Sequence, residues 1–158
     1  MALFLSSLIA LLATAPVPPP VLTAADRTAA FRAAGFAKAA GQWRKCDDPG
    51  TASYVPGTIE EVRDLNGDGL PEAVITESSS FCHGATGSGF DLVSKQANGI
   101  WQVMASQTGV PSFLARKGVA GWPDIEIGGP GFCFPVVRWD GKTYRQNRQE
   151  YQGKACRP

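Results

Sequence analysis

The sequence is poor in the residues and patterns on which most enzymes depend. Of its 158 residues only one is a histidine, His83, and no HExxH, phosphate-loop or dinucleotide-binding pattern occurs. No Cys-x-x-Cys pair is present, which disfavours zinc-ribbon and thioredoxin-like sites. The formal net charge is +1, so the chain has no overall attraction for nucleic acid or for a membrane surface. We therefore expect a protein that is not an enzyme and binds no nucleic acid.

No apolar run is long enough to cross a membrane comfortably. Residues 1–15 are uncharged and mostly apolar, but a run of about 14 residues falls short of the roughly 20 that span a bilayer. The run is typical of a signal peptide, which we expect to cover residues 1–24 and to leave one domain over 25–158. No Lys or Arg precedes it, so an uncleaved anchor is the alternative. The expected location is periplasmic or secreted, with no membrane span after cleavage.

The remaining sequence starts as a helix and continues as strands. Alanine dominates residues 26–40, Asp26 can cap a helix start and Gly41 can end it, which predicts a helix over 26–40. After Gly41, Gly- and Pro-rich turns separate short runs rich in Val, Ile and aromatic residues, a pattern typical of strands. The predicted strands are 58–63, 72–77, 89–96, 100–105, 124–127, 133–139 and 142–147. Asn98-Gly99 and Asp140-Gly141 predict two tight hairpins, because type I′ turns need residues that tolerate positive φ.

An internal repeat relates the two halves of the β region. The segment Gly69-Leu-Pro-Glu-Ala-Val-Ile75 aligns without gaps on Gly121-Trp-Pro-Asp-Ile-Glu-Ile127, and Phe81-Cys82 then matches Phe132-Cys133. We infer two units, at about 58–105 and 116–147, with chance similarity as the alternative. The expected fold is mainly β (α+β): an N-terminal helix packed on a small antiparallel β module built from two degenerate repeats.

Four cysteines indicate two disulfides in an exported chain. Cys82 and Cys133 hold equivalent positions in the two units, so we predict a bond between them, which leaves Cys46 to pair with Cys156. The alternative is Cys46–Cys82 with Cys133–Cys156.

The most informative motif is the acidic loop Asp64-Leu-Asn66-Gly-Asp68-Gly-Leu70-Pro-Glu72. Its oxygen-bearing side chains alternate around two glycines, which is the arrangement a hard cation such as Ca²⁺ requires. An EF-hand is disfavoured, because loop position 12 is Ile75 where a bidentate Glu is needed, and because the following residues are predicted as a strand. A solvated Asx-Gly turn without metal is the alternative.

The loop resembles the calcium loop of FG-GAP or VCBS-type repeats, the repeats of integrin α-chain propellers. The resemblance implies one structural Ca²⁺, and its ligands would be Asp64, Asn66, Asp68, the Leu70 carbonyl and Glu72. Two units are too few for a closed propeller, which needs at least about four blades. In unit two, Arg116, Gly118 and Ala120 replace the first three ligands, so we expect no Ca²⁺ there.

Catalytic candidates are weak. His83 would be the base of a Ser-His-Asp hydrolase, but no Gly-x-Ser-x-Gly elbow surrounds a serine. The carboxylates Glu60, Glu61, Asp91 and Glu126 could supply a glycosidase pair, yet carboxylates are too common for this to be a signal.

The segment Gly128-Gly-Pro-Gly-Phe132-Cys133-Phe134-Pro135 is unusual, because its glycines and prolines surround two aromatic residues and a cysteine. A rigid loop of this kind suits presentation of an aromatic side chain to a partner. We predict a partner-binding patch formed by Trp122, Phe132 and Phe134, with a purely structural corner as the alternative.

The function expected from these features is a non-catalytic, calcium-stabilised, disulfide-linked binding module, which we expect to be monomeric. Its partner would be a protein or an envelope glycan. An inhibitor of an envelope-acting hydrolase such as a lysozyme is the first alternative, and a small hydrolase is the second.

Overall fold

The computed structural model describes residues 20–157, and most of them lie in strands. The helices are α1 (Ala24–Ala33) and α2 (Ser80–His83), with short 3-10 turns η1 (Gly84–Thr86) and η2 (Val119–Gly121). The strands are β1 (Ala37–Ala39), β2 (Gln42–Arg44), β3 (Val55–Arg63), β4 (Glu72–Ser78), β5 (Ser88–Lys95), β6 (Trp101–Thr108), β7 (Val110–Lys117), β8 (Pro123–Gly128), β9 (Phe134–Trp139), β10 (Tyr144–Tyr151) and β11 (Lys154–Ala155). The prediction of a mainly β chain with one substantial helix is confirmed.

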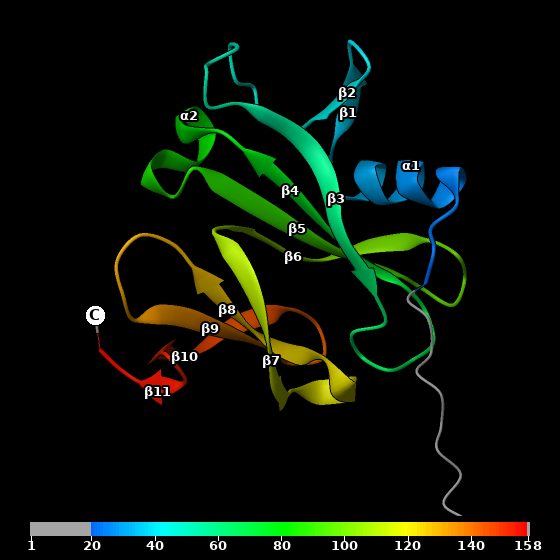
Figure 1. Cartoon of the computed structure of the whole chain (residues 1–158). Helices are drawn as coiled ribbons and strands as arrows, with labels where there is room; N and C mark the ends of the chain where they lie inside the picture. The colour runs from blue at the N-terminus through cyan, green and yellow to red at the C-terminus, as the bar shows by residue number, and fades with distance from the viewer. Residues whose placement is uncertain (1–19, 158) are drawn as a thin grey trace, which may run out of the picture.

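Within the described residues the strands form three antiparallel sheets. A four-stranded sheet has the order β3-β4-β5-β6, and a five-stranded sheet has the order β7-β8-β9-β10-β11. The hairpin β1-β2 stands apart from both. Figure 1 shows the two larger sheets as separate layers, joined where the chain passes through Gly109 from β6 into β7. Strands β3–β6 and β7–β10 are therefore two meanders with the same strand order, which correspond element for element.

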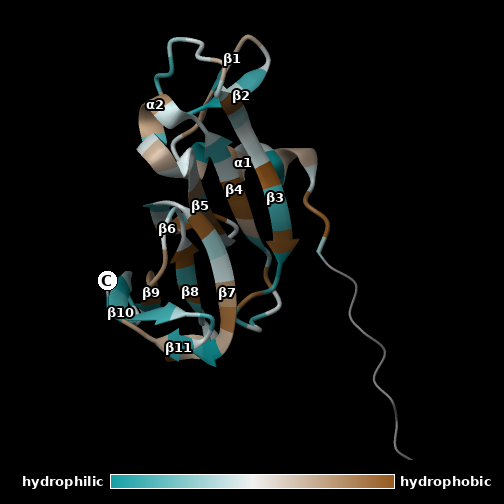
Figure 2. Cartoon of the chain, turned by 60° about the vertical axis from the view of Figure 1, so that its left-hand side comes forward, coloured by the Kyte–Doolittle hydropathy of each residue, from teal (hydrophilic) through white to brown (hydrophobic). Residues whose placement is uncertain are grey.

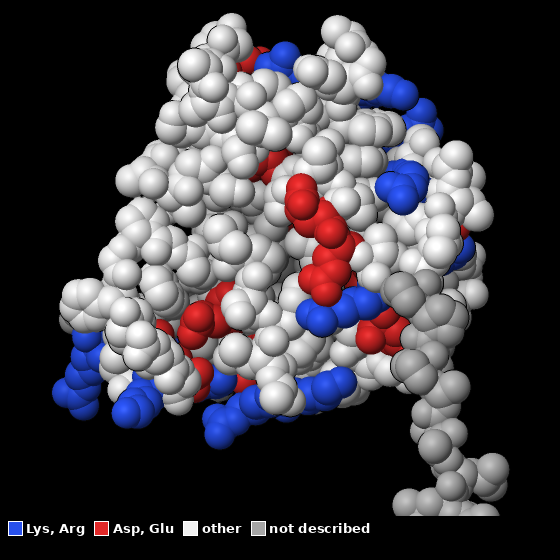
Figure 3. Space-filling model, viewed as in Figure 1, with Lys and Arg blue, Asp and Glu red and all other residues white. Residues whose placement is uncertain are grey.

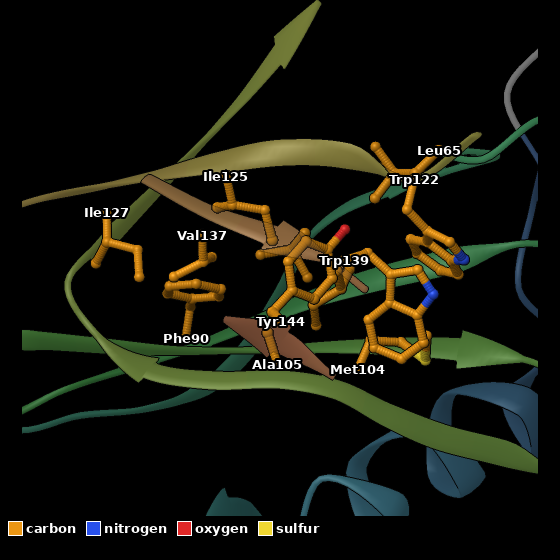
Figure 4. Close-up of a cluster of buried hydrophobic side chains, with 12 residues drawn as sticks. Leu65, Phe90, Met104, Ala105, Trp122, Ile125, Ile127, Val137, Trp139 and Tyr144 are labelled. Atoms are coloured by element: carbon orange, nitrogen blue, oxygen red, sulfur yellow. The ribbon is translucent and has the colours of Figure 1, made fainter. Parts of the chain in front are cut away.

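Two apolar clusters hold three layers together. Side chains of both sheets form the inner cluster, in which Phe90 of the first sheet meets Ile125 and Val137 of the second (Figure 4). The other face of the four-stranded sheet is covered by α1, whose Phe31 joins a cluster with residues of β4, β5 and β6. Because burial of apolar surface is the main favourable term in folding, these two interfaces carry most of the stability.

The two sheets stack face to back. Ala73 and Ile75 of β4 lie in the cluster beneath α1, whereas their aligned counterparts, Ile125 and Ile127 of β8, lie in the cluster between the sheets. The same face of each unit therefore packs on the preceding layer: unit one on the helix, and unit two on unit one. Strands β10 and β11, at one edge of the five-stranded sheet, are mostly hydrophilic (Figure 2).

Helix α1 differs from its predicted bounds. It starts two residues earlier, because the Thr23 side chain caps it by accepting a hydrogen bond from the backbone N–H of Asp26. It ends at Ala33 and is followed by Gly35, which has φ +87°. Residues 37–44 form the β1-β2 hairpin instead, so Gly41 serves a turn and not a helix end. The alanine-rich composition of residues 37–40 misled the prediction, because tertiary context overrides propensity.

The predicted strands correspond to β3, β4, β5, β6, β8, β9 and β10, and both predicted hairpin turns join the expected strand pairs. Strand β7 was not predicted. It contains Pro111, which is tolerated because β7 forms the edge of its sheet.

The predicted signal peptide lies largely outside the described residues. Its expected end, after Ala24, falls within α1, where Leu22 is buried in the helix-side cluster and Thr23 is the cap. Cleavage at that point would remove both contacts. No helix in residues 20–157 has the length and apolar character that crossing a membrane requires.

The disulfides follow the alternative pairing. Cys46 is bonded to Cys82, and Cys133 to Cys156, with Cα–Cα distances of 6.2 and 5.6 Å. The predicted Cys82–Cys133 bond is wrong because the equivalent positions of the two units belong to different layers. Stacked sheets lie about 10 Å apart, whereas bonded cysteines have Cα atoms roughly 4.4–6.8 Å apart.

Peptide mapping tests this pairing. Tryptic digestion of the oxidised protein should release peptide 46–63 linked to peptide 64–95, and peptide 118–138 linked to peptide 155–158. Mass spectrometry before and after reduction identifies both pairs. A linked pair that joins 64–95 to 118–138 would restore the rejected connectivity.

Candidate functional site

The acidic loop between β3 and β4 curls around its own side chains. Asp64 accepts hydrogen bonds from the backbone N–H groups of Gly67, Asp68 and Gly69, at 2.7–3.1 Å. Asn66 Oδ1 accepts a hydrogen bond from the Asp68 N–H, and Asp68 Oδ1 accepts one from the Leu70 N–H. These bonds gather the side-chain oxygens of Asp64, Asn66 and Asp68 in one short loop at the end of the sandwich.

Glu72 lies at the base of this loop, as the first residue of β4. It is only 1% exposed, and it accepts hydrogen bonds from the Leu65 backbone N–H at 2.6 Å and from the Ser94 hydroxyl at 2.8 Å. Burial raises the pKa of Glu72 to about 7. The two hydrogen bonds oppose that change, and the negative charges of Asp68 and Asp64 add to it.

The equivalent acid of unit two is balanced by arginines. Asp124 is fully buried, and its carboxylate accepts hydrogen bonds from Arg138 Nε and Nη2, both at 2.8 Å, and from Arg148. Burial alone would raise the pKa of Asp124, but these hydrogen bonds outweigh it and hold the pKa below its ordinary value. Among the described residues Glu72 has no ion-pair partner of this kind.

The donor set of the loop suits Ca²⁺. Carboxylate, amide and backbone carbonyl oxygens are the ligands that Ca²⁺ takes. A bound cation would also balance the negative charge of Glu72, which has no ion-pair partner among the described residues. Within residues 20–157, however, no three His, Cys, Asp or Glu side chains stand close enough together to hold a metal ion. The five-ligand calcium site, with Asp64, Asn66, Asp68, Leu70 and Glu72, therefore stays a prediction.

The corresponding loop of unit two braces the acidic loop. Lys117 Nζ donates a hydrogen bond to the Leu65 carbonyl at 3.2 Å. Gly121 lies so close to the Asn66 carbonyl that a Cβ atom there would clash with it. A change in the conformation of the acidic loop would thus be felt at the interface between the two units.

The predicted aromatic patch is divided by the structure. Trp122 is only 5% exposed and packs against Trp139 and Tyr144 between the sheets, so its assignment to a partner surface is wrong. A small β sandwich needs large side chains to fill its core, and Trp122 directly precedes β8 on the core side. Phe134 is half-buried against Tyr151. Phe132 is 66% exposed, as a partner-binding residue would be.

A second exposed phenylalanine was missed. Phe81, which aligns with Phe132 in the repeat, is 64% exposed on α2. Phe81 lies in the connection between β4 and β5, and Phe132 in the connection between β8 and β9. These two connections are in contact, because a Cβ atom at Gly129 of the second would lie 3.6 Å from Thr86 Oγ1 of the first. The matched Phe-Cys pairs were the signal in the sequence that could have identified Phe81. The two phenylalanines lie at the end of the sandwich opposite the acidic loop.

Of the weak catalytic candidates, His83 and Asp91 lie at one cleft on the four-stranded sheet, and the other carboxylates lie outside it. His83 ends α2, and its nearest hydrogen-bonding group is the Thr108 hydroxyl, 3.4 Å from Nδ1. Asp91 is paired with Lys45, and Glu126 belongs to the other sheet. The expectation of a protein without catalysis stays a prediction. Comparison of the chain with protein-family models, curated proteins and solved structures found no match.

Calcium should stabilise the folded protein. A ligand bound only by the native state at about 100 times its Kd contributes roughly 2.7 kcal/mol, which should raise the Tm by several degrees. We expect this rise in the parent, its loss on chelation, and its absence in Asp64→Ala/Asp68→Ala. Calorimetry of all forms with Ca²⁺ and with chelator measures it.

The matched control is Asp47→Ala/Glu60→Ala, which removes the same charge from exposed positions away from the loop. It should respond to Ca²⁺ as the parent does. An unresponsive parent, or equal responses in both double variants, would contradict the calcium prediction.

The Asp124 cluster should make stability depend on acid pH. The folded-state pKa of Asp124 is below its ordinary value of 3.8. The stability that ionised Asp124 contributes is therefore complete above pH 3.8, and it is lost as the pH falls through the folded-state pKa. Asp124→Asn should lower the free energy of unfolding at pH 7 by about 2–3 kcal/mol and weaken its dependence on pH below 4. Urea unfolding at several pH values measures both effects. Asp140→Asn, in an exposed pair with Arg145, should change stability much less.

Proposed function

We propose that this chain is an exported, non-catalytic binding module that holds a protein partner at the end of the sandwich bearing Phe81 and Phe132. The observation that carries the proposal is the exposure of these two phenylalanines at equivalent positions of the two units. Large aromatic side chains dominate the binding energy of protein interfaces when a partner's pocket covers them. Exposed at about two thirds each, they are the strongest apolar anchors on this end of the molecule.

The disulfides support the proposal, because each one restrains the connection that carries a phenylalanine. Cys82 directly follows Phe81 and is tied to Cys46 before β3. Cys133 directly follows Phe132 and is tied to Cys156 after β10. A connection restrained before binding loses less conformational entropy when the partner docks, and therefore gains affinity. Tyr151, which packs edge-on against Phe132, adds a third exposed aromatic ring.

The charged residues near the two phenylalanines indicate which charge the partner's surface should carry. The segments 79–87, 128–134 and 151–157 contain no Asp or Glu, whereas the last of them contributes Lys154 and Arg157. Figure 3 shows basic residues at this end of the five-stranded sheet, near the C-terminus, and acidic residues both beside them and toward the middle of the same view. Complementary charge increases association rate and specificity. The partner we propose is a protein with an apolar pocket and a carboxylate-rich rim.

An inhibitor of an envelope-acting glycosidase such as a lysozyme is the second candidate. The active clefts of such enzymes carry two carboxylates. Connections that contain no Asp or Glu and carry aromatic anchors beside basic residues are the kind that complements such a cleft. The acidic loop lies at the opposite end of the two sheets, so for either function we propose that Ca²⁺ has a structural role.

Paired substitutions test the proposed surface. Phe81→Ser/Phe132→Ser should reduce binding to the partner by about tenfold or more, because it removes both anchors. The matched control is Ile100→Ser/Val119→Ser, which changes two apolar residues at the other end that are also more than half exposed. Immobilised parent and both variants are compared for capture from an envelope extract, and for inhibition of cell-wall lysis by purified lysozyme.

A protein that is captured by the parent and the control, and lost only by the Phe81/Phe132 variant, supports the proposal. Inhibition of lysozyme with the same dependence favours the inhibitor candidate. Capture or inhibition that survives loss of both phenylalanines would place the binding surface elsewhere.

A further inference from the structure

A cleft of about 290 Å³ opens on the helix side of the four-stranded sheet, separate from the surface carrying Phe132. Its floor is formed by β5 and β6, where Asp91 and Ser106 stand directly opposite each other. Phe36 and the Cys46–Cys82 disulfide form its walls. The volume is just below the usual range for ligand clefts, about 300 to 1,000 Å³, and suits a ligand of a single small ring.

The only histidine of the chain lines this cleft, and one of its ring nitrogens has no hydrogen-bond partner among the described residues. The His83 ring fills the space that Gly89 leaves, because a Cβ atom at Gly89 would lie 2.5 Å from His83 Cε1. Its Nδ1 faces the Thr108 hydroxyl at 3.4 Å. Its Nε2 is buried and is the one such side-chain nitrogen or oxygen, among residues 20–157, without a hydrogen-bond partner. Unpartnered buried polar atoms are rare in folded proteins and need an explanation.

A neutralised ion pair lines the opposite side. Lys45 Nζ donates to Asp91 Oδ1 at 2.7 Å and to the Ser106 hydroxyl at 3.2 Å. Among the described residues this leaves Oδ2 of Asp91 free to accept a hydrogen bond and one ammonium hydrogen free to donate. The remaining carboxylate of the cleft, Glu77, is already engaged by the backbone N–H groups of Lys45 and Cys46 and by the Tyr54 hydroxyl.

We propose that this cleft binds one ring of a neutral, hydroxyl-rich ligand, namely a saccharide unit. A hydroxyl group both donates and accepts, so neighbouring hydroxyls can satisfy Asp91 Oδ2 and the Lys45 ammonium together. Because Nε2 is covered in this structure, a hydroxyl reaches it only when the His83 ring turns, and it then pairs with either tautomer of the imidazole. A charged ligand would gain little, because Lys45 and Asp91 already neutralise each other. The Phe36 ring offers an apolar wall for the C–H face of a sugar.

The single histidine makes the test direct. Its Hε1 proton gives one resonance in the NMR spectrum, which reports on the cleft of the intact, oxidised protein. We expect glucose or N-acetylglucosamine to shift this resonance saturably. Glucuronate and glucosamine, the charged analogues, should bind at least tenfold more weakly. No shift with either neutral sugar up to its solubility limit overturns the proposal, and so does tighter binding of a charged analogue.

Two variants locate the binding. Thr108→Val removes the hydroxyl that faces His83 and should weaken binding of the neutral sugar on the order of tenfold. Gly89→Ala displaces the His83 ring and should abolish the saturable shift. Gln102→Ala, an exposed residue of the same strand β6 outside the cleft, should bind as the parent does. Equal affinity in the parent and in Thr108→Val, with both folded, shows that the shift arises elsewhere and overturns the assignment.

Discussion

The structure depends on a sheet that must be covered on both faces. Strand β4 is buried on both sides: Ala73 and Ile75 point to the helix layer and Val74 to the second sheet. A four-stranded sheet with two apolar faces is not stable alone, because each exposed face would keep apolar surface in water. Helix α1 covers one face and unit two covers the other. The short helix needs this contact equally, since an isolated helix of its length is marginal in water.

The face-to-back stacking explains why the two units differ in polarity. Unit one lies in the middle of the molecule, so the buried acid at the start of its second strand, Glu72, sits at the edge of the interface between the sheets. Unit two is the last layer, and its equivalent acid, Asp124 of β8, faces away from unit one, where Arg138 of β9 and Arg148 of β10 reach it. A buried carboxylate requires a counter-charge or strong hydrogen bonds. Unit two supplies guanidinium groups, and unit one supplies a loop suited to a cation.

The arrangement separates the candidate sites in space. The acidic loop and the loop that braces it through Lys117 lie at one end of the sandwich. The connections with Phe81 and Phe132 lie at the other, each next to a disulfide. The cleft around His83 opens on the helix side of the four-stranded sheet, near the disulfide end. The predicted cation loop and the proposed protein-binding surface therefore lie at opposite ends of the two stacked sheets.

Features encoded over a few neighbouring residues were determined by the sequence alone. The hairpins at Asn98-Gly99 and Asp140-Gly141 follow from the backbone freedom of those pairs, and the acidic loop follows from the spacing of Asp64, Asn66 and Asp68. The repeat alignment matched residues 72–75 with 124–127, which lie in β4 and β8, but it did not predict β7, the counterpart of β3.

The tertiary structure decided the disulfide pairing, the burial of the aromatic residues and the composition of the cleft, because these depend on how the layers pack. Stacking the units as layers kept Cys82 from Cys133 and paired each with a cysteine flanking its own unit. It buried Trp122, which the sequence could not distinguish from Phe132, because both are aromatic residues next to a glycine-rich turn. It also brought His83, Asp91 and Lys45 around one cleft, although they lie on three segments of the chain. Contacts between distant segments depend on how whole sheets pack, and no local pattern in the sequence records that packing.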